Sequence, residues 1–300
     1  AATRELVSRS AAEPLSRASV VVGVNTDHLE AQDVSLDAIV DAYKTQLHHA
    51  EDAGAGVVLM ASRHLARAAR NADDYRHVYR EVLRAAGAPV ILHWLGPAFD
   101  PALAGYFASK EPGASADYLA AASDTLLEII AADRDKVSGV KMSLLDAESE
   151  MSVRRRLTPP ARMFTGDDYH YVGLIEGDPP STDSGQARTH SDALLGAFAA
   201  LAPNASAAIQ ALDHGDIAGY RAILGPTEAL SQQVFAVPTY YYKTGVAFLS
   251  WLNGHQPAFQ MIGGLHAARS LPHLSRIVEL GNASGASSGP SSRRRAGTPS

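Results

Sequence analysis

The sequence predicts an α/β protein built around a parallel sheet. Short apolar runs of strand length alternate with longer segments in which apolar residues recur at helical spacing. The strand-like runs are apolar at consecutive positions, which is typical of strands that are covered on both faces. Regular alternation of strand and helix implies parallel pairing through right-handed crossovers. The C-terminal third carries helical patterns alone.

The first half of the chain supplies four of the predicted strands and the helices between them. The strands are expected at 19–24, 57–60, 89–94 and 137–145. The helices are expected at 2–12, 35–53, 73–86 and 116–132. Gly54 and Gly56 follow the second of these helices, where glycine commonly ends a helix.

The second half completes the alternation and then changes character. A short strand is expected at 162–165, a helix at 168–175 and a sixth strand at 193–198. We place a helix after residue 165 because the gap is too short for a crossover to another parallel strand. Residues 203–280 are expected to be helical, with helices at 216–230 and 240–252. Residues 281–300 are predicted to be a disordered tail by composition.

Composition narrows the classes of function. The net charge of −6 and the pI of about 6.0 argue against a nucleic-acid partner. The sequence holds no apolar run of the roughly 18 residues that a membrane span needs, and its N-terminus lacks a signal-peptide pattern. The absence of cysteine excludes disulfides and favours a reducing compartment, so we predict a cytoplasmic protein without membrane or nucleic-acid partners.

Lys141 is the most informative residue of the chain. It lies inside the apolar run Val137–Leu145, which has the pattern of a buried parallel strand. Burial disfavours the charged form of lysine and lowers its pKa, and a partly neutral amine can form a Schiff base with a carbonyl group. The alternative from the residues alone is a strand-end lysine whose stem packs while its ammonium group reaches water.

Polar and titratable residues gather at the predicted carboxyl ends of the strands. In a parallel α/β fold these ends form the functional edge of the sheet. The residues at these positions are Asp27, His28, His64, His93, Lys141, Ser143, Gly166, Asp167, Asp168 and His190. Together with a lysine on an apolar strand, they favour an enzyme.

Three segments resemble the dihydrodipicolinate synthase and N-acetylneuraminate lyase family of Schiff-base aldolases. They are Ser138-Gly-Val-Lys141, Pro89-Val-Ile-Leu-His-Trp94 and Phe164-Thr-Gly-Asp-Asp168, in the family's order. The similarity covers roughly residues 15–275 and is greatest to a dihydrodipicolinate synthase-like subgroup. It implies a TIM-type (β/α)8 barrel with a C-terminal helical appendage. Here the first strand looks like the family's third, so we expect the first two βα units to be missing and the chain to be N-terminally truncated.

The resemblance also implies domains, roles and partners. We expect a partial barrel at 1–200, a helical region at 201–280 and the tail at 281–300. The implied activity is a class I lyase or synthase acting on pyruvate or another 2-keto acid with an aldehyde, in a homo-oligomer without a cofactor. Lys141 would be the nucleophile and His93, which replaces a family tyrosine, the proton relay. The expected substrate-binding residues are Asp27, His64, Ser143, Gly166, Asp167 and Asp168.

Two alternatives stay open at this point. Asp27, His28, His64 and His93 lie at neighbouring strand ends, and imidazoles with a carboxylate suit zinc or a similar ion in a barrel hydrolase or isomerase. The other alternative is a non-catalytic or incomplete relative. The arginine that often follows the His93 strand in the family is also absent, which argues against lysine biosynthesis itself.

Overall fold

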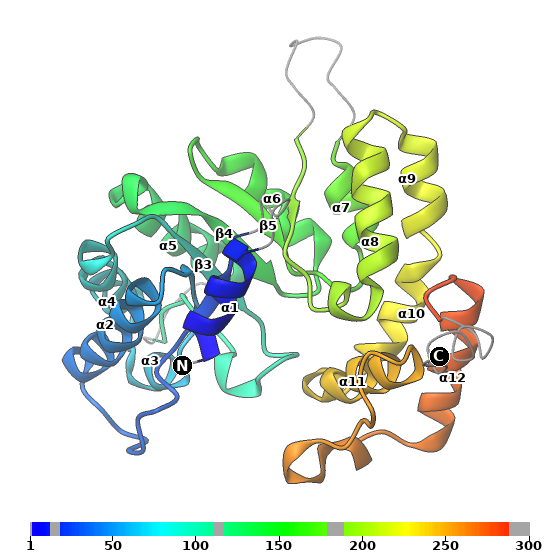
Figure 1. Cartoon of the computed structure of the whole chain (residues 1–300). Coiled ribbons are helices and arrows are strands. Elements are labelled where there is room, and N and C mark those ends of the chain that lie inside the picture. The colour runs from blue at the N-terminus through cyan, green and yellow to red at the C-terminus, as the bar shows by residue number, and fades with distance from the viewer. Residues whose placement is uncertain (1, 13–18, 111–116, 179–188, 288–300) are drawn as a thin grey trace. The chain divides into compact units, whose positions relative to one another are not determined.

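The computed structural model describes residues 2–12, 19–110, 117–178 and 189–287 (Figure 1). Within these residues six strands form one sheet, in the order in which they occur along the chain. The chain divides into two compact units. The first comprises Ala1–Leu144 with Glu148–Phe164, and the second comprises Leu145–Ala147 with Thr165–Ser300.

The first unit is an alternating α/β layer, as the sequence predicts. Its strands are β1 (Val21–Val24), β2 (Gly56–Leu59), β3 (Val90–Leu95), β4 (Val137–Ser143) and β5 (Arg162–Thr165, whose last residue belongs to the second unit). Its helices are α1 (Ala2–Ala12), α2 (Leu36–Asp52), α3 (Arg63–Ala68), α4 (Ala72–Ala85), α5 (Tyr118–Ala132) and α6 (Ala147–Arg156), with short 3-10 helices η1 (Pro101–Leu103) and η2 (Arg134–Lys136). Strands β1 to β4 pair in parallel, and α2, α4 and α5 lie side by side over them (Figure 1).

Alternation along the strands separates the core from the face that carries the chemistry. Successive side chains of a strand point to opposite faces. One face packs on the helices and is fully buried, and its residues are Val57, Leu59, Leu92, Trp94, Val140 and Met142. His93 and Lys141 have the opposite parity, and they are direct partners in the β3–β4 register. Lys141 is half-buried there.

The helices begin and end where local side chains satisfy their free backbone groups. Ser35 Oγ accepts from the backbone N–H of Ala38 at the start of α2, and Asn71 Oδ1 accepts from Asp73 and Asp74 at the start of α4. Gly54, at φ +77°, follows α2 in the left-handed conformation that glycine adopts without a steric cost. These capping interactions define where α2 begins and ends and where α4 begins, and therefore where the loops to the neighbouring strands start.

The second unit is mainly helical. It contains β6 (Asp192–Ala193), α7 (Tyr171–Glu176), α8 (Phe198–Asp213), α9 (Ile217–Leu224), α10 (Thr227–Val234), α11 (Tyr242–Leu252) and α12 (Leu271–Ala283), with 3-10 helices η3 (Thr239–Tyr241) and η4 (Ile262–Ala267). Helices α8 and α9 run side by side, and α12 packs on α10 and α11 (Figure 1). None of the helices in the described ranges is long and apolar enough to cross a membrane.

Several predicted elements need correction. The strand expected at 193–198 is only Asp192–Ala193, because Phe198 already begins α8. The helix expected at 216–230 is two helices, since Gly225 and Pro226 interrupt it. Helices α3 and α6 were not anticipated. Residues 253–261, expected to be helical, contain no helix.

The ends of the predicted regions also differ in detail. Helix α12 continues to Ala283, so the predicted tail begins with a helical end, and residues 288–300 lie outside the described residues. The boundary at residue 200 stays a prediction, since compactness groups β6 with the C-terminal helices. The absence of two βα units before β1 also stays a prediction.

Gly139 is the one strand glycine whose missing side chain the packing requires. A Cβ atom on Gly139 would lie 2.3 Å from the carbonyl oxygen of Arg162 and 2.7 Å from the Phe164 ring, both in β5. Real Cβ atoms do not approach this closely, so β4 and β5 could not keep their spacing. The absence of a side chain at Gly139 therefore allows β4, which carries Lys141, to lie close to β5.

We expect Gly139→Ala to lower the free energy of unfolding by about 1–3 kcal/mol or more, through overpacking against backbone that cannot move aside. The measurement is urea-induced unfolding followed by circular dichroism. Gly173→Ala is the matched control, since a Cβ there meets nothing within 4 Å in helix α7, and alanine favours the helix. Equal stabilities of the two variants would contradict the packing role of Gly139.

Candidate active site on the inner face of the first unit

His93 is the centre of the candidate site. It lies on β3 with only 3% of its surface exposed. Its Nε2 lies 2.9 Å from Ser143 Oγ on β4, and its Nδ1 lies 3.1 Å from Met60 Sδ, directly after β2. The structure thus joins three neighbouring strand ends through one imidazole. Met60 is not among the site residues that the sequence predicts. It follows Val58 of β2 by two residues, and alternate residues of a strand point to the same face, so its position is consistent with the face that carries His93.

The pKa of His93 is lowered well below 6.5. Burial is the main cause, because desolvation disfavours the imidazolium ion, and the charge of the neighbouring Lys141 lowers the pKa further. Both ring contacts are to neutral groups, Ser143 and Met60, so neither supplies the negative charge that would stabilise an imidazolium ion. At neutral pH His93 is therefore a neutral imidazole that can accept a proton.

Ser143 completes the group formed by Lys141 and His93. It is 3% exposed and follows Lys141 by two residues, so both side chains have the same parity on β4. Its carbonyl oxygen accepts from the backbone N–H of Gly96 at 3.0 Å, which fixes the end of β4 beside the end of β3. A potential nucleophile, a neutral base and a hydroxyl group therefore share one face of two paired strands.

The predicted rim residues Asp27 and His64 have other partners. His64 is 7% exposed, and its Nδ1 lies 2.9 Å from Thr26 Oγ1, which in turn lies 2.6 Å from Ser62 Oγ. The hydroxyl of Tyr106 accepts from the Ser62 backbone N–H at 3.1 Å, and Tyr106 packs edge-on against Phe107 in the core. His64 thus belongs to a buried hydroxyl cluster, separate from the contacts of His93.

Asp27 takes part in a bridge between loops. Its carboxylate pairs with Arg63 at 3.1 Å, and Arg63 also pairs with Asp100 in the loop after β3. The bridge joins the segments that follow β1, β2 and β3. Arg63 is not among the residues that the sequence predicts for the site, because nothing local in the sequence indicates its two partners.

The segment after β5 belongs to the second unit. Asp167 Oδ1 accepts from the backbone N–H groups of Tyr169 and His170, and its Oδ2 lies 2.9 Å from His170 Nδ1. Asp168 Oδ1 accepts from the Ala197 backbone N–H at 2.8 Å. Gly166, Asp167 and Asp168 are all buried. The hydrogen bonds of Asp167 build the turn into α7, and that of Asp168 reaches the start of α8. Substrate binding by the three residues stays a prediction.

The histidines do not form a metal-ligand set. His28 lies on the surface with Nδ1 3.3 Å from Gln46 Nε2, whereas His64 and His93 have the separate partners described above. In the described ranges, no group of three or more histidine, cysteine, aspartate or glutamate residues is arranged to hold a metal ion. The metal-dependent alternative therefore has no assembled site in this part of the chain.

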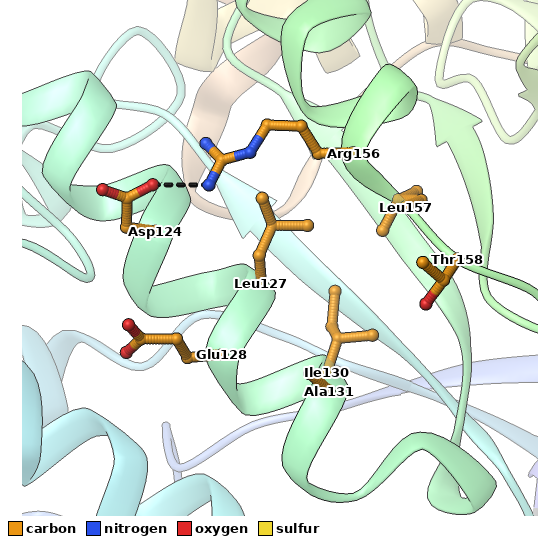
Figure 2. Close-up of a pocket in the computed structure, with 8 residues that line it drawn as sticks. All are labelled: Asp124, Leu127, Glu128, Ile130, Ala131, Arg156, Leu157 and Thr158. Atoms are coloured by element: carbon orange, nitrogen blue, oxygen red, sulfur yellow. Dashed lines mark hydrogen bonds and ion pairs between the residues drawn. The ribbon is translucent and has the colours of Figure 1, made fainter.

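A pocket of about 470 Å³ opens elsewhere on the first unit, between α5 and the segment after α6 (Figure 2). Leu127, Ile130 and Leu157 are among its lining residues, and Asp124 pairs with Arg156 at 2.6 Å beside them. Its lining residues include neither Lys141 nor His93. This pocket belongs to the helical layer and is distinct from the candidate site.

Fold and site together define a parallel α/β protein of the barrel type, with a lysine on the inner face of its sheet. The chain belongs to the family described as "Protein of unknown function (DUF993)", which matches residues 1–296. A search of curated proteins finds no match.

Solved structures of the dihydrodipicolinate synthase family share the fold. YagE, a prophage protein of that family from Escherichia coli K12 in complex with pyruvate, is 15% identical with a TM-score of 0.63, over 94% of this chain and 78% of that chain. A putative dihydrodipicolinate synthetase from Pseudomonas aeruginosa is 17% identical with a TM-score of 0.62, over 93% and 78%. Dihydrodipicolinate synthase from Acinetobacter baumannii, complexed with pyruvate, is 12% identical with a TM-score of 0.59, over 94% of this chain and 79% of that chain. The resemblance predicted from three motifs is thus confirmed for the fold.

The cause of the lowered His93 pKa can be tested by titration. We expect His93 to titrate well below pH 6.5 in NMR spectra of the folded protein. Lys141→Met should raise this pKa by removing the nearby charge, but the pKa should stay below 6.5 because burial is the larger cause. A pKa that Lys141→Met leaves unchanged would contradict the proximity of the two groups.

The same pKa predicts how stability changes with pH. The unfolded chain, with a histidine pKa near 6.5, binds a proton before the folded one does, so the free energy of unfolding should fall as pH decreases from about 6.5 towards the folded pKa. His93→Gln should remove this contribution. Denaturant unfolding at a series of pH values measures how the free energy of unfolding changes with pH. The same pH dependence in His93→Gln as in the wild-type protein would contradict the prediction.

Proposed function

We propose that this protein is a Schiff-base-forming carbon–carbon lyase or synthase that acts on a 2-keto acid and an aldehyde. The observation that carries the proposal is the pairing of Lys141 with His93 across β3 and β4, on the face opposite the helices. A primary amine on a partly desolvated strand can attack a keto group, and a neutral imidazole beside it can accept the proton that such chemistry releases. The fold, shared with structures that contain pyruvate, supports this substrate class.

Lys141 would act as the nucleophile. Its Nζ adds to the keto carbon of the substrate, the keto oxygen leaves as water, and a protonated imine remains. The imine then withdraws electrons from the neighbouring carbon, so that a carbon–carbon bond to that carbon can form or break. The iminium ion formed from the lysine is itself the electron sink, so this chemistry requires no organic cofactor.

The remaining roles follow from position. His93 would exchange protons with the reacting groups, because it is neutral, buried and beside Lys141. The Asp27–Arg63–Asp100 bridge would hold the strand-end loops around the substrate. We further propose a homo-oligomer, which light scattering of the purified protein measures directly.

Borohydride trapping tests the proposal. We expect pyruvate with borohydride to give one covalent adduct, detected by intact-mass analysis and mapped to Lys141 by peptide sequencing. Lys141→Met should abolish the adduct. Lys136→Met is the matched control, since Lys136 precedes the same strand and its Nζ donates to the Ala86 carbonyl oxygen, so the adduct should persist. No adduct with any of a panel of 2-keto acids would overturn the proposed function.

A further inference from the structure

The two contacts of His93 determine which of its ring nitrogens carries the proton. Nδ1 lies 3.1 Å from Met60 Sδ, and a thioether sulfur has no proton to donate. The contact is attractive only when Nδ1 is the donor. A neutral imidazole carries a single N–H group, so Nε2 then has a free lone pair. Met60 thus selects the tautomer protonated at Nδ1.

This tautomer determines the direction of the second hydrogen bond. Nε2 lies 2.9 Å from Ser143 Oγ and, without a proton, can only accept. The Ser143 hydroxyl must therefore donate to the imidazole. A hydroxyl group that donates to a neutral histidine, itself oriented by a third side chain, is the arrangement by which proteins activate serine. Both partners are 3% exposed, so bulk water competes little for either group.

The position of Ser143 relative to Lys141 brings this hydroxyl to the reacting group. Along a parallel strand, two residues span about 6.6 Å, and alternate residues share a face. Ser143 therefore lies one side-chain position beyond Lys141, towards the carboxyl end of β4, which is the functional end of a parallel sheet. Substrate attached to Lys141 Nζ would lie beside the Ser143 hydroxyl, with the ring of His93 behind it.

We infer that Ser143 is a catalytic residue that transfers the proton at the substrate carbon next to the imine, and that His93 is the base that takes up the serine proton. The inference rests on the proposed function and deepens it. It changes the role expected for Ser143 from substrate binding to proton transfer, and it makes Met60 a positioning residue.

The step balances in protons and charge. The substrate C–H bond breaks, and its proton goes to Ser143 Oγ as the serine proton moves to His93 Nε2. The electron pair of the C–H bond forms the carbon–carbon double bond of an enamine, and the pair from the C=N bond returns to Lys141 Nζ. The positive charge thus moves from the iminium nitrogen to the imidazole. After the enamine carbon adds to an aldehyde, the new alkoxide takes the proton back through Ser143.

Hydrogen exchange into pyruvate separates this step from imine formation. With pyruvate in deuterated water, we expect the wild-type protein to exchange the methyl protons, as followed by NMR. Ser143→Ala should slow this exchange by about 10²-fold or more, the range for loss of a general acid–base group. Borohydride trapping at Lys141 should persist in the same variant. Ser138→Ala is the matched control on β4, because Ser138 lies three residues before Lys141 and its Oγ donates to the Val90 carbonyl oxygen.

The outcomes distinguish the two proposals. If the wild-type protein forms no trapped adduct, the proposed function fails. If the adduct forms but Ser143→Ala exchanges within about twofold of wild type, the function stands and the role of Ser143 is overturned. Slow exchange in both Ser143→Ala and Ser138→Ala would also overturn it, since the effect would then arise from the strand as a whole.

Met60→Leu tests the tautomer directly. Leucine nearly conserves the volume but cannot accept a hydrogen bond, so the preference for Nδ1–H should be lost. We expect ¹⁵N NMR to show the proton of His93 on Nδ1 in the wild-type protein and a shift towards Nε2 in Met60→Leu, with slower exchange and persistent trapping. A wild-type protein protonated at Nε2 would refute the inference.

Discussion

The pairing of His93 with Lys141 across β3 and β4 is the constraint on which the site depends. A cation beside a buried imidazole keeps that imidazole neutral, because burial and the neighbouring charge both disfavour the imidazolium ion. Carboxylate partners would have the opposite effect, and both contacts of His93 are to neutral groups. The site therefore combines one potential positive charge with one neutral proton acceptor. The β3–β4 register places His93 directly opposite Lys141, and residues that are direct partners on parallel strands share a face of the sheet.

The fold was predictable where the pattern of apolar residues is regular. Strands β1 to β5 and helices α2, α4 and α5 lie within a few residues of the expected ranges. Most of these strands are short continuous apolar runs, and the helices repeat apolar residues at helical spacing. Helix α3 was missed because its polar first turn resembles a loop, although Ser62 caps it through a hydrogen bond to Leu65 N–H. Strand β6 was misplaced because an apolar run of six residues fits both a strand and the first turn of a helix.

Assigning faces was harder than assigning elements. Consecutive valines in β1 do not indicate which of them points to the helices, and only the structure shows that Val22 packs against the core. Val58, which has the opposite parity to Val57 and Leu59 on β2, is also buried. In contrast, Lys141 and Ser143 share a parity that the sequence already contains. The contact between His93 and Met60 joins residues 33 positions apart, so no local pattern indicates it.

The motif Gly166-Asp167-Asp168 shows why a resemblance in sequence assigns roles less reliably than it assigns a fold. Both carboxylates accept hydrogen bonds from backbone N–H groups, Asp167 within the turn into α7 and Asp168 from the start of α8. A buried carboxylate that satisfies backbone donors is costly to replace whatever the reaction, because substitution leaves those donors unpaired. The same residues can therefore recur in proteins of one fold without a shared substrate.

The charge carried by Lys141 links the structure of the resting site to the proposed reaction. Before the enamine forms, the positive charge of the lysine or its iminium ion lowers the affinity of His93 for a proton. Formation of the enamine removes that charge, so the repulsion disappears at the moment when a proton must be accepted. The imidazole is then a stronger base during the reaction than in the resting protein. A carboxylate in its place would be most stable while the iminium ion persists and would oppose the transfer. A neutral base beside the lysine therefore favours enamine formation, and burial together with the charge of Lys141 keeps His93 neutral beforehand.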